Sequence, residues 1–243
     1  MIKYKEGRNH SGKDRIKPKV YNSRFIHLKL LRDAISNSFK KYQKSAQELT
    51  IVDFGCGEKP YKEIFSNEFT KYIGVDIPGN KNADYEIDLE TGKSKLEENF
   101  ADVVISIQVL EHVQHVQKYL KECRRILKPN GNLVLSTHGY WIFHPDPGDY
   151  WRWTVQGLTD ELTRAGFKVI KINGIMGLLS TSIQLFQDAV LLSFPLKRYW
   201  GKCFIIIMQF FIYVANSLEN KSKSLKSYRN RDACVFLVEA EKI

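Results

Sequence analysis

The chain has 243 residues, of which 43% are hydrophobic and 26% charged, and its formal net charge is +10. These values exclude an intrinsically disordered polypeptide and predict a globular protein that buries a sizeable core. The start of the chain has no apolar stretch of the signal-peptide kind, and the four cysteines lack CxxC or zinc-like spacing. We therefore expect free thiols, no metal site and a cytoplasmic location.

The positive charge lies toward the two ends of the chain. Residues 1–50 carry a net charge of +9 and residues 197–231 carry +7, whereas residues 51–196 carry −4. A nucleic-acid-binding protein usually concentrates its basic residues on the functional face. Basic ends around an acidic centre suit an anionic membrane surface or an acidic partner at least as well.

Residues 1–20 are polar and basic, and we expect them to be mobile or to form a lid. Apolar residues then recur at helical spacing over 23–47, which predicts one amphipathic helix. Beyond it, short apolar runs alternate with helical patterns. The expected strands are 49–54, 71–76, 85–88, 101–107, 132–137, 167–172 and 233–240, and the expected helices are 115–127 and 155–165, the second with Thr154 as its N-cap. This alternation predicts an α/β fold with a doubly wound, mainly parallel sheet of seven strands.

Residues 174–218 interrupt the alternation with two strongly apolar stretches, which predict two helices inserted before the last strand. They suit a cap over the site, a dimer face, or docking on a membrane surface helped by Lys197, Arg198 and Lys202. A true membrane span is disfavoured, because the first stretch contains polar residues and the second has about 16 residues where a span needs ~20. The expected organisation is a basic N-terminal segment and helix (1–48), a core (49–173), a helical insert (174–231) and a final core strand (232–243).

In an open parallel sheet, ligands bind beyond the carboxyl ends of the strands. Asp53, Gly55, Cys56 and Gly57 follow the first strand, and the glycines let the backbone approach a ligand closely. Asp76 ends the second strand and suits the two hydroxyls of a ribose. The run continues as Glu-Lys-Pro-Tyr without a third glycine, which argues against an NAD-type pyrophosphate site, and no Walker-type motif is present.

The motifs VDFGCGEKPY, GVDI, DVVISIQVLEHV and LKPNGNLVLST, in this order, resemble the class I S-adenosylmethionine-dependent methyltransferases of the type 11-like group. The resemblance covers roughly 49–172 and the last strand, and implies a Rossmann-like fold, S-adenosylmethionine as cofactor and direct methyl transfer. It places Asp53, Gly55 and Gly57 at the methionine part of the cofactor. Cys56 and Tyr61, in the same run, are further candidates for cofactor binding. It places Asp76 at the ribose, Ile77, Asp88 and Leu89 at the adenine, and Gln108 and His112 beside the cofactor. His112 is either a structural residue there or a general base.

The stretch HGYWIFHPDPGDYWRWT (138–154) follows the fifth strand and resembles the loop of a bacterial subgroup that modifies cell-envelope saccharides and related small molecules. His144 and Tyr150 are candidates for acceptor contact, and His144 or Asp149 for the base that deprotonates a hydroxyl. Alternatively, Asp149 and Arg152 form an ion pair that only holds the loop. Aromatic rings such as Trp141, Tyr150 and Trp151 suit stacking on a sugar.

The sequence thus predicts a methyltransferase for a small-molecule or saccharide acceptor, which the apolar insert makes a candidate for lipid linkage. Such a protein would be cytoplasmic or peripheral at the inner face of the membrane, and the insert would also allow oligomers. The alternatives are a nucleic-acid methyltransferase and a non-catalytic cofactor-binding protein. The Asn/Asp-Pro-Pro-Tyr signature of base-methylating enzymes is absent after the fourth strand, where ISIQVLEH stands.

Overall fold

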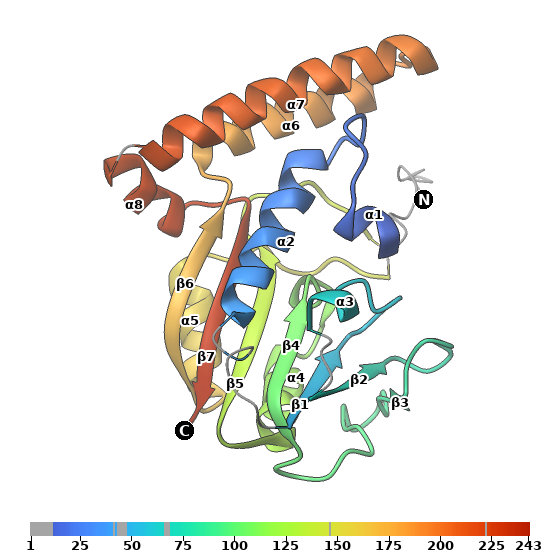
Figure 1. Ribbon diagram of the computed structural model, residues 1–243, viewed down its shortest axis with the longest axis vertical. Coiled ribbons are helices and arrows are strands. Elements are labelled where there is room, and N and C mark those ends of the chain that lie inside the picture. The colour runs from blue at the N-terminus through green and yellow to red at the C-terminus, as the bar shows by residue number, and fades with distance from the viewer. Residues whose placement is uncertain (1–11, 41, 43–47, 66–68, 146, 222) are drawn as a thin grey trace.

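The computed structural model describes residues 12–40, 42, 48–65, 69–145, 147–221 and 223–243. Its centre is one seven-stranded sheet in the order β3-β2-β1-β4-β5-β7-β6, drawn in Figure 1. The strands are β1 (Leu49–Phe54), β2 (Thr70–Asp76), β3 (Tyr85–Glu86), β4 (Ala101–Ile107), β5 (Leu127–His138), β6 (Phe167–Ile175) and β7 (Val235–Lys242). The pairs formed among β1 to β5 are parallel, and β7 runs antiparallel to both β5 and β6. The predicted doubly wound, mainly parallel sheet is confirmed.

Helices cover both faces of the sheet (Figure 1). They are α1 (Gly12–Ile16), α2 (Phe25–Phe39), α3 (Lys62–Phe65), α4 (Val116–Ile126), α5 (Val155–Arg164), α6 (Leu178–Ser193), α7 (Arg198–Lys221) and α8 (Lys223–Arg231), with a 3-10 turn, η1, at Leu110–His112. On one face α2 and α3 pack on the sheet through Leu31, Ile35, Phe39 and Phe65. On the other, α4 and α5 pack on it through Leu120, Ile126, Leu158 and Leu162. Apolar strands buried on both sides are typical of parallel sheets.

Most predicted elements lie within a few residues of their expected bounds. The Thr154 hydroxyl accepts a hydrogen bond from the Gly157 N–H at 3.1 Å, as expected of an N-cap. The first long helix ends at Phe39 instead of continuing to 47, and residues 41 and 43–47 lie outside the described residues. Strand β5 begins at Leu127, five residues early, because Leu127 pairs with Ala101 before the register shifts. Of the segment expected to be mobile or a lid, residues 1–11 are not described and Gly12–Ile16 form α1.

The insert between β6 and β7 forms three helices, of which α6 and α7 lie side by side across the end of the sheet where the parallel strands terminate (Figure 1). Helix α7 has 24 residues, because its polar ends extend the apolar stretch of about 16 that the sequence suggests. By length and composition alone it could cross a membrane, with a mean hydropathy of 1.5, although 28% of its most apolar window is buried in the protein. The Glu219 carboxylate of α7 accepts hydrogen bonds from the Leu179 N–H and the Ser180 hydroxyl, both at 2.7 Å, and so caps α6.

Candidate active site

The chain leaves β1 through a glycine turn. Gly55 has φ +87°, and a Cβ atom there would lie 2.6 Å from the Val109 side chain, so the position requires glycine. The N–H groups of Gly55 and Cys56 donate to the Val75 carbonyl at 2.8 and 3.1 Å and attach the turn to β2. Gly57 has nothing within 4 Å of its Cβ position. The turn therefore offers a ligand a stretch of bare backbone.

The carboxylate of Asp76, at the end of β2, joins this turn to the next loop. Its Oδ2 accepts hydrogen bonds from the Gly57 N–H at 2.7 Å and from Asn80 Nδ2 at 2.6 Å, and its Oδ1 accepts from the Ile77 N–H at 2.8 Å. Asn80 also donates to the Gly57 carbonyl at 2.8 Å. No motif in the sequence points to Asn80. A half-buried carboxylate fixed in this way retains one acceptor site, on Oδ1, for a ribose hydroxyl.

Asp53, near the end of β1, is buried beneath the glycine turn. Burial raises the pKa of its carboxyl to about 7, and the hydrogen bond that the Tyr72 hydroxyl donates at 2.5 Å opposes this rise. Burial also raises the pKa of the Cys56 thiol, which therefore stays protonated at neutral pH. Tyr61 is buried nearby, and burial raises the pKa of its phenol. Of these groups, the Asp53 carboxyl is the one that changes charge near neutral pH.

The residues expected at the adenine lie on the surface loops after β2 and β3. Ile77 and Leu89 expose 45% and 70% of their surface, which leaves them free to cover an apolar ring. The Asp88 carboxylate accepts hydrogen bonds from the N–H groups of Glu90 and Thr91, at 2.8 and 3.0 Å, which lower its pKa. In this structure Asp88 therefore holds its own turn.

Gln108 and η1 follow the end of β4. Gln108 has φ +57°, and its N–H donates to the Ser136 carbonyl at 3.0 Å, which connects the ends of β4 and β5. His112 Nδ1 is hydrogen-bonded to the Gly148 carbonyl. Because a carbonyl oxygen can only accept, Nδ1 carries the hydrogen, and Nε2 of the neutral ring is left as an acceptor. The Tyr150 N–H donates to the Glu111 carbonyl at 2.8 Å, so the loop after β5 is attached to η1 at two points.

An ion pair holds the loop after β5. Arg152 donates to both carboxylate oxygens of Asp149, and Asp149 Oδ2 also accepts from the His144 N–H at 2.9 Å. Although burial opposes it, these contacts hold the pKa of the Asp149 carboxyl below its usual range. The alternative in which Asp149 and Arg152 fix the loop therefore agrees with the geometry. A catalytic role of Asp149 stays a prediction.

The His144 ring points toward the residues after β4 and β5. Its centroid lies 4.8 Å from that of His112 and 5.0 Å from that of His138. Burial, together with His112, lowers the pKa of His144 to about 4. Trp141 stacks on His138 with centroids 4.9 Å apart. The structure thus brings His112 and His144 together and adds His138, whose one signal in the sequence is its place at the end of a strand.

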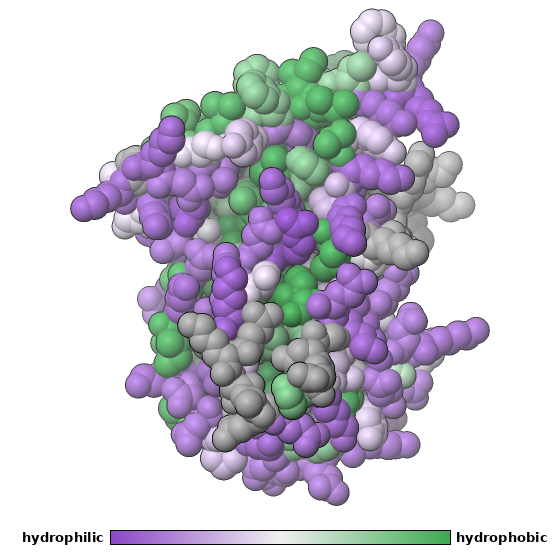
Figure 2. Space-filling view, in the orientation of Figure 1, coloured by the Kyte–Doolittle hydropathy of each residue, from purple (hydrophilic) through white to green (hydrophobic). Residues whose placement is uncertain are grey.

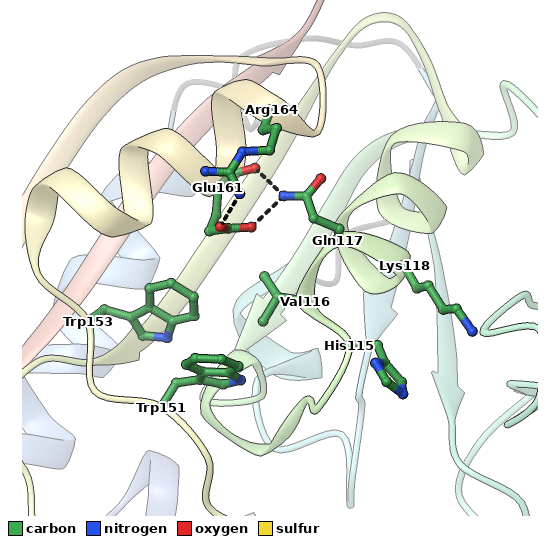
Figure 3. Close-up of a pocket in the computed structure, with 8 residues that line it drawn as sticks. All are labelled: His115, Val116, Gln117, Lys118, Trp151, Trp153, Glu161 and Arg164. Atoms are coloured by element: carbon green, nitrogen blue, oxygen red, sulfur yellow. Dashed lines mark hydrogen bonds and ion pairs between the residues drawn. The ribbon is translucent and has the colours of Figure 1, made fainter.

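Tyr150 and Trp151 face outward, with 53% and 40% of their surface exposed. Trp151 lines a surface hollow between α4 and α5, drawn in Figure 3, together with Trp153 and Glu161. Gln117 spans this hollow by donating to a Glu161 carboxylate oxygen at 2.6 Å. The hollow contains none of the residues expected to be catalytic or to bind the cofactor. Trp151 therefore lines this hollow, whereas Tyr150 is an exposed ring on the loop that carries His144.

These residues form two neighbouring groups at the carboxyl edge of the sheet. One surrounds the glycine turn and Asp76, and the other joins η1 to the loop after β5. A sheet of this topology, with bare backbone after β1 and a fixed carboxylate after β2, suits a nucleoside-containing cofactor with a cationic amino-acid part. The sheet topology and these two groups of residues together define the class I fold of S-adenosylmethionine-dependent methyltransferases.

Comparisons with known proteins agree. A family model described as a methyltransferase domain matches residues 24–172, more than half of the chain, and the chain belongs to this family. The ubiquinone biosynthesis O-methyltransferase of Bradyrhizobium sp. (strain ORS 278) is 30% identical over 127 residues, which cover 46% of this chain and 50% of that protein. The chain thus spans about half the length of the curated relatives it matches.

Two solved structures show the same fold. An S-adenosylmethionine-dependent methyltransferase from Mesorhizobium loti aligns with a TM-score of 0.51 at 15% identity, covering 91% of this chain and 98% of that one. Phosphoethanolamine N-methyltransferase 2 from Haemonchus contortus, in complex with S-adenosylmethionine, aligns with a TM-score of 0.53 at 14% identity, covering 96% and 60%. The chain is thus a member of a methyltransferase-domain family, and its fold is that of the S-adenosylmethionine-dependent methyltransferases, which agrees with the predicted enzyme class and cofactor.

Proposed function

We propose that this enzyme methylates a hydroxyl group of a lipid-linked small molecule, such as a lipid-linked saccharide or ring, at the cytoplasmic face of a membrane. The observation that carries the proposal concerns the α6–α7 pair, which lies across the carboxyl edge of the sheet. This pair buries polar side chains and exposes large apolar ones. The curated relatives, which are named as O-methyltransferases of ubiquinone biosynthesis, support oxygen as the acceptor atom.

Both α6 and α7 bury polar side chains against the rest of the protein. The buried side chains of α6 are all polar: Ser180, Thr181, Gln184, Gln187 and Asp188. Gln184, Gln187 and Gln209 each donate an amide hydrogen bond to the Ser23 carbonyl, at 3.2, 2.9 and 3.0 Å. The pair is thus fastened to the start of α2 by hydrogen bonds. Met208 and Ile212 of α7 are buried, but most of the large apolar side chains of the pair are left for the outer face.

The outer face of the pair is apolar. The exposed aromatic and aliphatic side chains there include Leu178, Phe186, Leu192, Phe194, Trp200, Ile207, Phe210, Phe211 and Leu218. Figure 2 shows this hydrophobic surface over α6 and α7 at the top of the molecule. Contiguous exposed apolar surface marks an interaction site. Lys197, Arg198 and Lys202 adjoin it, and α8 adds further basic residues, which suits an anionic bilayer better than a second copy of this basic chain.

For the cofactor, we propose the arrangement that the resemblance implies. Asp76 would hold the ribose hydroxyls, Gly55 and Gly57 would give their bare backbone to the methionine part, and Asp53 would supply a negative charge to it. The other neighbours of the cofactor would be Cys56, Tyr61, Ile77, Asp88, Leu89, Gln108 and His112. Bound S-adenosylmethionine supplies a methyl group already activated on a sulfonium, so the protein has to align the acceptor and remove its proton.

On the acceptor side, we propose that Tyr150 and His144 contact the acceptor and that His112 accepts the proton of its hydroxyl. His112 suits this role because the Gly148 carbonyl orients its ring and leaves Nε2 as the acceptor atom. Asp149 acts through the loop, since Arg152 occupies both of its oxygens.

Transfer of the labelled methyl group tests the proposal. The full chain is incubated with methyl-labelled S-adenosylmethionine and, separately, with a polyprenyl phenol in vesicles, a lipid-linked saccharide and an RNA transcript. We expect label in a lipid-phase acceptor, with no transfer by Asp76→Ala. Label in RNA alone would replace this function by nucleic-acid methylation. Cofactor binding without transfer to any of the three would favour a non-catalytic protein.

A further inference from the structure

Three metal-ligating side chains from separate segments converge beside the proposed acceptor site. Glu111 lies in η1, His138 ends β5 and His144 lies in the following loop, and one donor atom from each lies within 4.8 Å of the other two. Glu111 and His138 are buried, and His144 is half-buried. The ligands are 27 and 6 residues apart in the sequence, a spacing that no metal motif predicts. The prediction of no metal site is based on the spacing of the cysteines alone.

The donor atoms lack hydrogen-bond partners. Among the described residues, Glu111 Oε1, His138 Nδ1 and His144 Nδ1 are buried without one, and the nearest carboxylate oxygen to His144 Nδ1 that forms an ion pair with it is Asp149 Oδ2, at 3.6 Å. Glu111 Oε1 and His138 Nδ1 lie 3.1 Å apart but do not form a hydrogen bond, whereas Glu111 Oε2 accepts one from the Thr137 hydroxyl at 2.9 Å. A buried polar atom without a partner is destabilising, because it has lost its hydration and gained no hydrogen bond. Unpartnered atoms on all three side chains of one cluster are what a bound cation would satisfy.

The local charges also favour a cation. The two arginines whose charges act on His144 are already compensated, because Arg152 pairs with Asp149 and Arg24 pairs with Asp188. Glu111 forms no ion pair with lysine or arginine among the described residues. Its buried carboxylate is therefore left without a permanent positive charge beside it.

We propose that Glu111, His138 and His144 bind one divalent transition-metal ion. Two imidazoles and one carboxylate suit zinc, and three protein ligands leave one coordination position open, as in catalytic zinc sites. Donor atoms around tetrahedral zinc lie roughly 3.3 Å apart, so the widest pair closes by about 1.5 Å on binding. His144 supplies this movement, because it lies on a loop and its side chain is partly exposed.

An open coordination position would let an acceptor oxygen bind the ion, and this part of the inference rests on the proposed function. An ion there would lower the pKa of an acceptor hydroxyl and so ease the transfer of its proton to His112, whose ring lies 4.8 Å from that of His144. The oxygen forms its bond to the methyl carbon as the carbon–sulfur bond breaks. Sulfur keeps that electron pair and becomes a neutral thioether.

Zinc binding to the purified full chain, stripped with a chelator, tests the site without any acceptor. Calorimetry with Zn²⁺ and the visible absorption of added Co²⁺ are measured for the wild type, His144→Ala, Glu111→Gln and the control His115→Ala, an exposed histidine outside the cluster. We expect one ion per wild-type chain, unchanged binding in the control, and at least ~100-fold weaker binding in both ligand variants.

The proposal is overturned if the wild type binds Zn²⁺ no more tightly than His144→Ala. It is overturned equally if removing Glu111 and His144 leaves the affinity unchanged. Circular dichroism of the stripped proteins checks folding, and if Glu111→Gln unfolds, the half-exposed His144 decides. Neither metal-binding assay uses an acceptor or measures turnover, so a wrong acceptor assignment would not change the measured metal affinity. Conversely, absence of a metal site would not change the outcome of the methyl-transfer assay.

Discussion

Asp149 and Arg152 form a two-point ion pair in which Nη1 donates to Oδ1 and Nη2 to Oδ2, each at 2.6 Å. The same guanidinium donates to the carbonyls of Trp141 and Ile142, at 3.0 and 2.7 Å. The two ends of the loop after β5 are therefore joined by one planar side chain, and His144 is held between them.

Arg152→Lys should weaken this frame, because an ammonium cannot reproduce the two-point geometry or reach both carbonyls. We expect the free energy of unfolding to fall by about 1–3 kcal/mol and turnover to fall further, with cofactor affinity kept. Denaturant unfolding and calorimetry measure these effects. Arg164→Lys, in the more exposed pair with Glu161, is the matched control and should change stability by less than about 0.5 kcal/mol. Equal effects of the two variants would show that the loop does not depend on Arg152.

Asp53 should make stability depend on pH. Its pKa is about 7 in the folded chain against an ordinary 3.8, so between these values the folded state holds a proton that the unfolded state has lost. Its contribution is therefore most favourable below this window, declines as the pH rises through it, and is level above pH 7. The decline is at most about 4 kcal/mol. Asp53→Asn should remove it and Asp160→Asn, on the surface of α5, should not. An unchanged slope in Asp53→Asn from pH 4 to 8 would assign it to other groups.

The same carboxyl should couple pH to cofactor affinity. A cationic methionine part favours ionised Asp53, so the affinity should rise about tenfold from pH 6 to pH 8. Calorimetric titration with S-adenosylmethionine measures the change, with Asp53→Asn as the reference. An affinity profile shared by both proteins would place Asp53 away from the charged part of the cofactor.

The strands and the glycine turn could be predicted from the sequence because each depends on neighbouring residues. A buried parallel strand is a short apolar run, and the turn that follows it requires glycine at Gly55 because of its positive φ. The carboxyl-edge position of Asp53 and Asp76 then follows from the topology alone.

The partners of these residues could not be predicted, because they depend on how loops pack. Asn80 reaches Asp76 across a turn, and His138 meets Glu111 because β5 and η1 end side by side. The polar residues of α6 would be expected on its solvent-facing side, but its glutamines face the Ser23 carbonyl instead of water. Periodicity shows that the faces of a helix differ, but it does not show which of them is covered.

Asp76→Ala should abolish useful cofactor affinity. The change removes the proposed ribose contacts and also releases the Gly57 and Asn80 donors. Because two hydrogen bonds to a charged group are lost, we expect the cofactor affinity to fall by at least ~100-fold. Asn80→Ala should cause a smaller loss, because Gly57 still holds the carboxylate. Glu90→Ala, an exposed acid, serves as the control. Calorimetry with S-adenosylhomocysteine measures the affinity. If folded Asp76→Ala retained the wild-type affinity, the assignment of Asp76 to the ribose would be wrong.

The outer face of α6 and α7 should bind anionic vesicles. Phe186 and Phe210 expose 59% and 60% of their surface, so replacing both by serine should leave the fold intact. Burying one phenylalanine is worth about 1.5–3 kcal/mol, and the double variant should therefore bind phosphatidylglycerol vesicles at least tenfold more weakly in co-sedimentation. Ile170→Ser, an equally exposed apolar residue on β6, is the control. If the wild type ignores these vesicles at low salt and light scattering shows a dimer that the double variant loses, the face is a subunit interface instead of a membrane contact.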